Sequence, residues 1–426
     1  MGIVGTYRNG EYKKIDYLPI FLYAAIVIFG WCNIFSASRS EIFSFAMPYG
    51  KQLIWIGIAA IVAFVVLFIE PRFFSNTAYI FYGLGIVLLV ATLIFGREVN
   101  GAKSWLYIGG VGMQSTEFAK VGTALALAKY LSGQDIDMKR WRTWAVIGMI
   151  LLVPMGLIIC QHDVGSMLVF VCFIIPLYRF GFPRSLIYLG LILLTLFVFT
   201  QSGWFGEKYE NYIIIGIVVL CCLFYLFAYV GKPTTKQYLL TLLALALCSG
   251  FVLVSDKLVS KLDQHQQDRI KVLFDPTYKL DNEGYNVHQA KIAIGSGGFA
   301  GKGFMGGTVT NAHFVPEQHT DFIFCTVGEE YGFIGAGGLL LAYLWLLQHL
   351  VTMAERQASV FGRFYGYSVS AVFFTHVFIN VAMVVGLMPC IGIPLPFLTY
   401  GGTSLVAFTL LLFIFIRMDA NHTSLL

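Results

Sequence analysis

The amino-acid sequence predicts an all-α polytopic membrane protein, a helical bundle of about 12 membrane segments with one large extracytoplasmic loop. Of its 426 residues, 58% are hydrophobic and only 12% are charged, whereas about 25% of the residues of a soluble protein are charged. Mean hydropathy is +0.76. Apolar runs of about 20 residues recur along the chain, and a run of that length can cross a bilayer as a helix.

The apolar runs, taken in order, are the expected spans. We place them at residues 17–38, 50–69, 77–96, 118–131, 142–160, 163–181, 184–202, 211–230, 237–255, 328–350, 364–386 and 400–418. The run at 118–131 is short and amphipathic, so we expect it to be half-buried or re-entrant. No segment outside the spans is large enough to fold alone, and residues 1–426 are expected to form a single membrane domain.

The positions of the basic residues predict the orientation of the chain. With the N-terminus in the cytoplasm, most Lys and Arg residues outside the loop 257–325 fall in connections on the cytoplasmic side, as in Lys139-Arg140. This is the bias expected of a multi-pass membrane protein. An even number of spans then places both termini in the cytoplasm and the loop 257–325 outside. The first run, 17–38, is too long for a cleaved signal peptide.

The external loop 257–325 carries most of the polar chemistry and ends with His319 and Asp321. A carboxylate at the mouth of a membrane helix is costly unless it is solvated or paired, so Asp321 is a candidate functional residue. The alternative is that Asp321 caps the helix that follows. Arg269 and Lys302 could hold an anion such as a pyrophosphate. They could equally form a solvated face or attract anionic lipid headgroups.

Local signals subdivide the loop. Asp275-Pro276 and the run 281–284 are typical of turns. Residues 285–294 suit a short amphipathic helix ended by Gly295, and the glycine-rich stretch that follows is flexible or tightly turned. We expect no metal site, because no His, Cys, Asp and Glu spacing matches a common metal motif. The eight cysteines mostly lie in apolar runs, where cysteine behaves as a small hydrophobic residue.

Two earlier stretches carry further candidates. Glu117 and Lys120 share one face of a helix that Ser115 or Thr116 could cap. They form either a structural ion pair at a helix entry or the polar wall of an external cavity. Asp163 begins the run 163–181, where it serves as a helix N-cap or as part of the same external site.

A proline-rich segment separates the last two runs. Residues 386–403 contain Pro389, Pro394 and Pro396, which are incompatible with a continuous helix. The segment has no charged residue. Irregular backbone at membrane depth must line a cavity or be buried in protein.

Six stretches resemble the SEDS (shape, elongation, division, sporulation) family and, within it, the RodA branch. They are GAKSWLYIG (101–109), QSTEFAK (114–120), QHDVGS (161–166), LFDPTYKLDNEGYNVHQAKIAIGSGGFAGKG (273–303), FVPEQHTDFIF (314–324) and IPLPFLTYGG (393–402). The resemblance runs in order from about residue 15 to 418. It differs from the family pattern at Ser104, Ser115, His162 and Thr399, and by an apparent helical hairpin, 205–256, added to the usual ten spans.

The resemblance implies a peptidoglycan glycosyltransferase of the bacterial cytoplasmic membrane. Such an enzyme polymerises lipid II, extending an undecaprenyl-linked glycan strand during cell elongation. Its partners would be a class B penicillin-binding protein and other elongation-complex membrane proteins, and no nucleic acid. The catalytic aspartate of the family falls on Asp321. Four further family positions fall on Trp105, Glu117, Lys120 and Asp163. Together with His319, Lys302, Arg269 and Thr399 of this sequence, they form the expected substrate-binding or supporting set.

The expected chemistry is attack of a sugar hydroxyl on an anomeric carbon that carries a lipid pyrophosphate. Asp321 would take the hydroxyl proton. Cationic side chains, or a divalent cation such as Mg²⁺ or Mn²⁺, would stabilise the leaving pyrophosphate. Two other functions remain open from the sequence. A flippase for the lipid-linked precursor would need polar groups continuing to the cytoplasmic side. A non-catalytic scaffold would use the acidic residues only as caps.

Overall fold

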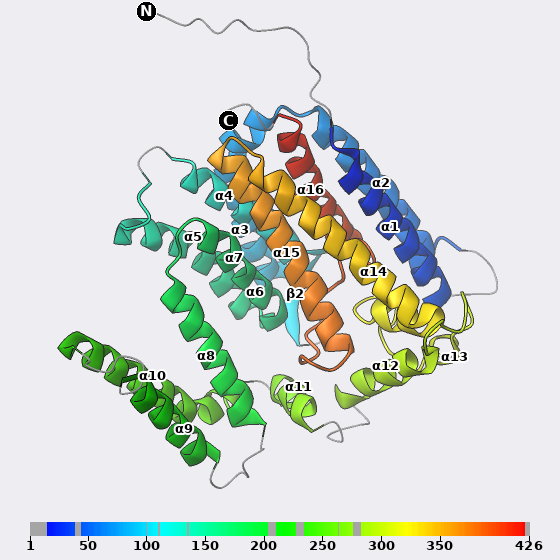
Figure 1. Ribbon diagram of the computed structural model, residues 1–426. Helices are drawn as coiled ribbons and strands as arrows, with labels where there is room; N and C mark the ends of the chain where they lie inside the picture. Colours follow the sequence, from blue (N-terminus) through cyan, green and yellow to red (C-terminus); the bar gives the residue numbers. More distant parts are fainter. Residues whose placement is uncertain are drawn as a thin grey trace, which may run out of the picture. The chain divides into compact units, whose positions relative to one another are not determined.

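Helices make up nearly all the regular structure of the chain in the computed structural model shown in Figure 1. The structure describes residues 15–38, 44–99, 101–109, 111–133, 136–202, 210–226, 234–262, 264–275 and 283–421. Within these ranges, nine helices are long and apolar enough to cross a membrane, and two shorter apolar stretches lie at Val164–Arg179 and Asn211–Phe224. The prediction of an all-α polytopic membrane protein is confirmed, whereas the number of spans stays a prediction.

The chain divides into two compact units. The first contains residues 1–180, 290–384 and 391–426, and the second contains residues 181–289 and 385–390. The helices of the first unit are α1 (Tyr17–Ala37), α2 (Pro48–Phe68), α3 (Pro71–Phe95), α4 (Ser115–Leu131), α5 (Trp141–Cys160), α6 (Val164–Phe170), η1 (Val171–Phe173), α7 (Ile174–Arg179), α13 (Thr308–Asn311), α14 (Ile323–Glu355), α15 (Val360–Val384) and α16 (Gly402–Asp419). The helix α12 (Glu283–Gly297) joins the two units along the chain.

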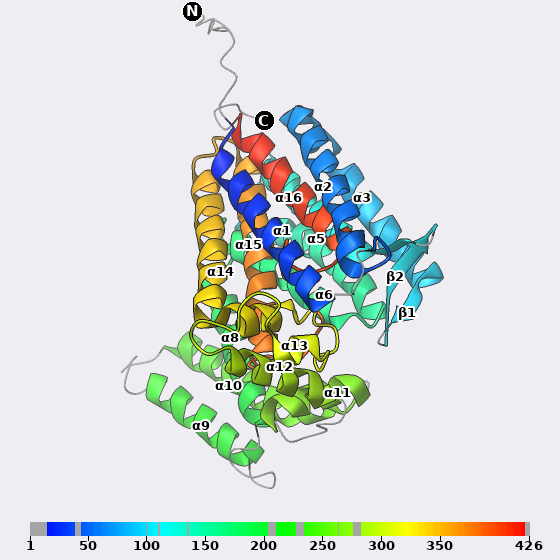
Figure 2. The same ribbon diagram turned by 90° about the vertical axis from the view of Figure 1, so that its right-hand side faces the viewer.

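The core of the first unit is formed by α4, α15 and α16. The apolar windows of α15 and α16 are 78% buried, whereas that of α2 is only 22% buried. Figures 1 and 2 show α14 beside α15, and α16 beside α2. Helices at the centre of the unit are therefore mostly surrounded by protein, whereas the outer helices leave more of their surface for lipid.

The prediction that the fourth apolar run is amphipathic is wrong, whereas the prediction that it is half-buried or re-entrant in the membrane stays a prediction. Apart from a few residues, α4 is buried along its whole length. It packs closely on α3, because Gly85 lies against the backbone of Ala119 and Gly122 lies against the carbonyl of Phe81. Small residues let two membrane helices approach this closely. The polar side chains at the start of α4 therefore point into protein.

A small sheet connects α3 to α4, and we did not predict it from the sequence. The strands β1 (Arg97–Val99), β2 (Ala102–Ile108) and β3 (Val111–Gln114) pair antiparallel in that order. Gly101 and Gly109 have φ of 80° and 59°, which suits the tight connections. Figure 2 shows β1 and β2 beside the end of α3. The register places Trp105 opposite Gln114, the residue that precedes α4.

The glycine-rich stretch after α12 is tightly turned, and it inserts into a break in α14. Gly332 has φ 62° and ψ −158°, so the helix is interrupted there. The freed carbonyls of Glu329 and Glu330 accept from the amides of Lys302 and Gly303, at 3.1 and 2.9 Å. On the other side of the break, the amides of Phe333 and Ile334 donate to the carbonyls of Gly298 and Phe299. The inserted segment thus replaces the hydrogen bonds that the break removes, as membrane depth requires.

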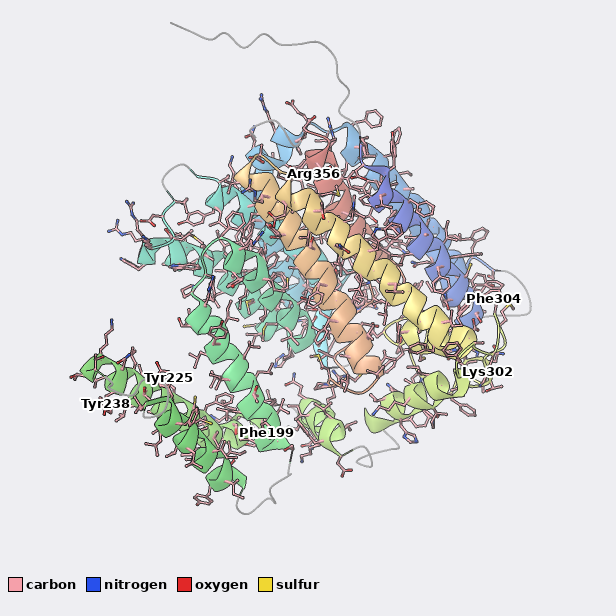
Figure 3. All side chains as sticks on the ribbon, viewed as in Figure 1. Phe199, Tyr225, Tyr238, Lys302, Phe304 and Arg356 are labelled. Carbon is pink, nitrogen blue, oxygen red and sulfur yellow. The ribbon has the colours of Figure 1, made fainter. Side chains whose placement is uncertain are left out.

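The second unit contains α8 (Arg184–Gln201), α9 (Glu210–Phe224), α10 (Thr235–Val259) and α11 (Gln264–Phe274). Its core is Leu196 of α8, Ile214 of α9, and Cys248 and Val252 of α10, and Phe199 packs against this cluster (Figure 3). The predicted hairpin 205–256 corresponds to α9 and α10. Its turn with Lys232, the end of the run 211–230, and the predicted turns at Pro276 and Asp281-Asn282 lie outside the described residues. Glu283 and Gly284, which were expected to complete the second turn, instead begin α12.

Candidate functional site

Asp321 lies in the turn that immediately precedes α14. The N-cap of α14 is Phe322, so the alternative in which Asp321 is the cap is wrong. Asp321 is half-buried. A Cβ atom placed on Gly392 would be 3.2 Å from Asp321 Oδ2. The carboxylate of Asp321 therefore faces the backbone of the proline-rich segment at Gly392. A side chain at position 392 would displace the carboxylate.

Two contacts join the turn around Asp321 to the proline-rich segment. Asn380 of α15 donates through Nδ2 to the carbonyl of Asp321 at 2.8 Å and to that of Ile393 at 2.7 Å. The amide of Tyr400 donates to the carbonyl of His319 at 3.0 Å. The irregular segment is therefore held by hydrogen bonds on both sides. Residues 395–399 are buried in protein, whereas residues 386–392 are partly or fully exposed, so the prediction of burial is confirmed only for the later part.

His319 and Thr399 support this junction in different ways. The ring of His319 lies 5.6 Å from that of Tyr400. Burial lowers the pKa of His319 below its ordinary value, because the charged imidazolium is poorly solvated there. Thr399 Oγ1 accepts from the amide of Leu395 at 2.8 Å. Thr399 therefore fixes the turn of the proline-rich segment.

Glu117 and Lys120 form a buried ion pair. Both are 2% exposed, and Lys120 Nζ lies 2.9 Å from each oxygen of Glu117. Lys120 Nζ also lies 2.7 Å from His376 Nε2 of α15. The prediction that Ser115 or Thr116 caps α4 is wrong, because both residues are inside the helix and Gln114 is the N-cap. The pair is enclosed in protein, as a structural ion pair would be, and its place in the wall of an external cavity stays a prediction.

Asp163 is the N-cap of α6, as one reading of the sequence predicted. Its carboxylate accepts from the amide of Ser166 at 2.9 Å and from the Ser166 hydroxyl at 2.8 Å. Gln114 donates through Nε2 to Ser166 Oγ at 3.3 Å. A Cβ atom on Gly165 would be 2.5 Å from the carbonyl of Ile391, so the start of α6 lies directly against the proline-rich segment.

Trp105 lies at the edge of this region. It is half-buried, and its indole packs within 3.3 Å of where a Cβ on Gly112 would be. Because it is paired in register with Gln114, it shares a face of the sheet with the residue that reaches Ser166. The sheet thus carries Trp105 to the side of α4 where the acidic and basic candidates begin.

Lys302 belongs to the first unit of the chain and Arg269 to the second. Lys302 Nζ contacts Glu329 Oε1 at 2.7 Å, and Glu329 also accepts from the amides of Val309 and Thr310. Lys302 is thus paired, with its side chain 25% exposed. Figure 3 shows it at the opposite end of α14 from Arg356. Arg269 lies on α11 of the second unit, so joint binding of an anion by these two residues stays a prediction.

Three residues of this arrangement were missed from the sequence. His376 and Asn380 are four apart on α15 and therefore share a face, and Glu329 organises the segment after α12. Two polar residues at that spacing in the apolar run 364–386 are the signal that could have identified the α15 pair. In the part of the chain that the structure describes, no three His, Cys, Asp or Glu side chains gather closely enough to hold a metal ion.

The assembled site has two centres that α15 connects. One contains Asp321, His319 and the backbone at Gly392, and the other contains Glu117 and Lys120. His376 contacts the second centre, and Asn380 contacts the first. A half-buried carboxylate and a buried ion pair are thus each linked, through a side chain of α15, to the same irregular segment.

Comparison with known proteins identifies the family. A family model for FtsW, RodA and SpoVE, described as cell cycle protein, matches residues 16–211 and 191–424. Peptidoglycan glycosyltransferase RodA of Treponema pallidum is 34% identical over 414 residues, covering 92% of this chain and 94% of that protein. Peptidoglycan glycosyltransferase MrdB of Escherichia coli K12 is 28% identical over 393 residues, covering 92% and 90%.

Two solved structures have the same fold. One, described as the structural coordination of polymerization and crosslinking by a peptidoglycan synthase complex, aligns with a TM-score of 0.67 and 27% identity, covering 96% of this chain and 98% of that one. The crystal structure of the rod shape determining protein RodA of Thermus thermophilus aligns with a TM-score of 0.59 and 26% identity, covering 96% and 98%. The family match and the Treponema relative each span most of the sequence, and the chain therefore belongs to the SEDS family of FtsW, RodA and SpoVE proteins.

Proposed function

We propose that this protein polymerises lipid II into glycan strands on the outer side of the cytoplasmic membrane during cell elongation, with Asp321 as the general base. The enzyme class follows from the family: the protein is a peptidoglycan glycosyltransferase, as its relatives are named. The assignment of the base rests on one observation. Asp321 is the half-buried carboxylate of the site, it is not the N-cap of its helix, and it lies beside the backbone of Gly392.

The reaction that we propose forms one glycosidic bond and releases one lipid pyrophosphate. The hydroxyl of one sugar attacks the anomeric carbon of another while the carbon–pyrophosphate bond breaks, and Asp321 takes the hydroxyl proton. A positioned general base typically contributes about 10²–10⁴-fold. Because both substrates are anchored in the membrane by their polyprenyl chains, they meet in a common plane, which lowers the entropic cost of their encounter.

The two lysines suit different tasks in this scheme. Lys120 is enclosed with Glu117, so it shapes the interior wall of the site. Lys302 is partly exposed, so it can meet the pyrophosphate through a point-charge contact. A Mg²⁺ or Mn²⁺ ion would take oxygen ligands from the pyrophosphate itself, since no three-ligand group lies among the described residues. We assign no step to such an ion.

A partner and an orientation complete the proposal. The solved complex in which polymerization and crosslinking are coordinated supports a class B penicillin-binding protein as partner, within an elongation complex. For the orientation, Arg356 contacts both Asp16, before α1, and Asp419, at the end of α16. The first span therefore begins where the last one ends, at one end of the first unit, which supports placing both ends on the same side of the membrane, the cytoplasmic side in our proposal.

The test of the base is Asp321→Asn. Asparagine is nearly isosteric, but it does not take up a proton at neutral pH. We expect a drop of at least about 100-fold in the rate of strand formation, with unchanged expression and unfolding temperature. The assay uses purified lipid II, the protein with its partner, and moenomycin to suppress other polymerases. Asp137→Asn is the matched control, because Asp137 is an exposed carboxylate whose side chain is 48% accessible and far from the site in the chain.

The outcomes separate the candidate functions. Strand formation by Asp321→Asn at nearly the wild-type rate would reject Asp321 as the base. If the wild-type protein itself forms no strands with its partner present, the polymerase proposal fails. The scaffold function would then be the one to pursue.

A further inference from the structure

We propose that His376 is a positioning residue of this enzyme, which holds the Lys120 side chain and the backbone of Pro394 in one fixed arrangement beside Asp321. The proposal rests on the proposed function and adds a residue to it. It starts from the two ring nitrogens of His376, each of which lies within hydrogen-bond distance of a different part of the site.

The contacts of His376 determine its tautomer. Nδ1 lies 3.0 Å from the carbonyl oxygen of Pro394, which can only accept, so Nδ1 carries the proton. Nε2 lies 2.7 Å from Lys120 Nζ, which as an ammonium can only donate, so Nε2 presents its lone pair. The ring is therefore neutral, and it forms an ordered link in which Lys120 donates to His376 and His376 donates to Pro394.

This link leaves Lys120 little freedom. Its ammonium donates to Glu117 and to His376, and it lies 5.3 Å from the centre of the Phe408 ring. Phe408 also packs edge-on against His376, with ring centres 4.8 Å apart. The flexible Lys120 side chain is thus held by the Glu117 carboxylate, the His376 imidazole and the face of the Phe408 ring. Such restraint is expected of a charged group that must keep one position in a functional site.

The link also leads toward Asp321. One turn along α15, Asn380 donates to the carbonyl of Ile393 and to that of Asp321. His376 and Asn380 therefore hold two consecutive carbonyls of the proline-rich segment, those of residues 394 and 393. The next residue back is Gly392, against which the Asp321 carboxylate lies. A shift at Pro394 would be transmitted to Gly392 within two residues.

A purely structural histidine is the alternative. His376 is 1% exposed in an otherwise apolar helix, and burying a polar ring is favourable only when its hydrogen bonds are made. That requirement alone would be met by any two partners. The partners of His376 are Lys120 and the backbone of Pro394, which both belong to the site. A positioning histidine and a purely structural histidine therefore predict different effects on kcat in a variant that still folds.

The experiment compares three substitutions that keep different halves of the link. His376→Phe keeps a ring and removes both hydrogen bonds. His376→Gln keeps an acceptor that can reach Lys120, and His376→Asn keeps a donor near Pro394. The control is His349→Gln, on α14, where the histidine contacts Asp16 at the other end of the unit. The values of kcat and KM for lipid II and the unfolding temperature are measured for each protein with its partner.

We expect kcat of His376→Phe to fall about 10- to 100-fold, the scale of a small misplacement of reacting groups, with KM within about twofold of wild type. The Gln and Asn variants should fall between Phe and wild type, because each restores one contact. The control should keep its kcat. A merely structural role would instead lower the unfolding temperature and the amount of active enzyme, and leave kcat per folded molecule unchanged.

Several results would overturn the proposal. One is that folded His376→Phe has the kcat of the wild type. Another is that the loss of activity in all three variants equals the fraction of protein that is unfolded. If His376→Phe does not fold, the Gln and Asn variants decide, and wild-type kcat in both rejects the role. Wild-type protein that forms no strands contradicts the proposed function instead, so the two failures are distinguishable.

Discussion

The buried pair of Glu117 and Lys120 makes a quantitative prediction about folding. We consider Lys120→Met, which keeps most of the side-chain volume and removes the charge. It leaves the Glu117 carboxylate without its cation and His376 Nε2 without its donor. Glu117→Gln is milder, because the amide oxygen can still accept from Lys120. The double variant removes both charges together.

The contacts determine the expected magnitudes. Removing one member of a buried ion pair typically costs about 3–5 kcal/mol, and this pair is 2% exposed on both sides with contacts of 2.9 Å. We therefore expect Lys120→Met to lower the free energy of unfolding by about 3–5 kcal/mol. The double variant should be more stable than Lys120→Met alone, with a coupling free energy of about 2–3 kcal/mol, the upper part of the range for residues in contact.

The assay is a double-mutant cycle in equilibrium unfolding in mixed micelles, with strand formation measured in parallel. The free energy of unfolding is compared for the wild type, the two single variants and the double variant. Free energies that add within about 0.5 kcal/mol, the behaviour of independent sites, would refute the pairing. Because Lys120 also contacts His376, the double variant should recover stability without recovering polymerisation. Full recovery of both would contradict the role of Lys120 in the site.

Three further predictions test the break in α14, the acid response and the hairpin. Gly332→Ala should lower the free energy of unfolding by more than about 1–3 kcal/mol. The reason is that φ of Gly332 is 62° and a Cβ there would be 2.3 Å from the amide nitrogen of Gly301. The control Gly57→Ala, in an open part of α2, should be neutral or slightly stabilising. The pKa of His319 is lowered in the folded protein, so as the pH drops the unfolded chain takes up a proton on this residue before the folded one does. The free energy of unfolding of the wild type should therefore fall as the pH drops below about 6.5. Unfolding measured between pH 7.5 and 5 should show a shallower fall in His319→Gln. A well-folded deletion of 205–256 should retain strand formation in the lipid II assay, because α9 and α10 expose mostly apolar side chains suited to lipid, and loss of activity would show that the hairpin contributes.

Local signals in the sequence predicted local structure well. The helix expected at 285–294 is found at Glu283–Gly297, although Gly295 does not end it as predicted. Asp163 is an N-cap. Both features depend on residues within one or two turns. The small sheet was missed, although Gly101 and Gly109 mark its connections. The fourth helix was judged by its short apolar run, and its burial instead depends on α3, which Gly85 and Gly122 allow to approach.

By itself, the sequence determined the class of the protein, most helix positions and the family motifs that carry Asp321, Glu117 and Lys120. Hydropathy and turn chemistry act over a few residues, so they can be read along the chain. Only the tertiary structure decided that Lys120 meets His376, 256 residues away, and that the segment after α12 enters the break at Gly332. Such contacts arise because irregular backbone at membrane depth must find hydrogen-bond partners in protein, and which distant residue supplies them is set by helix packing.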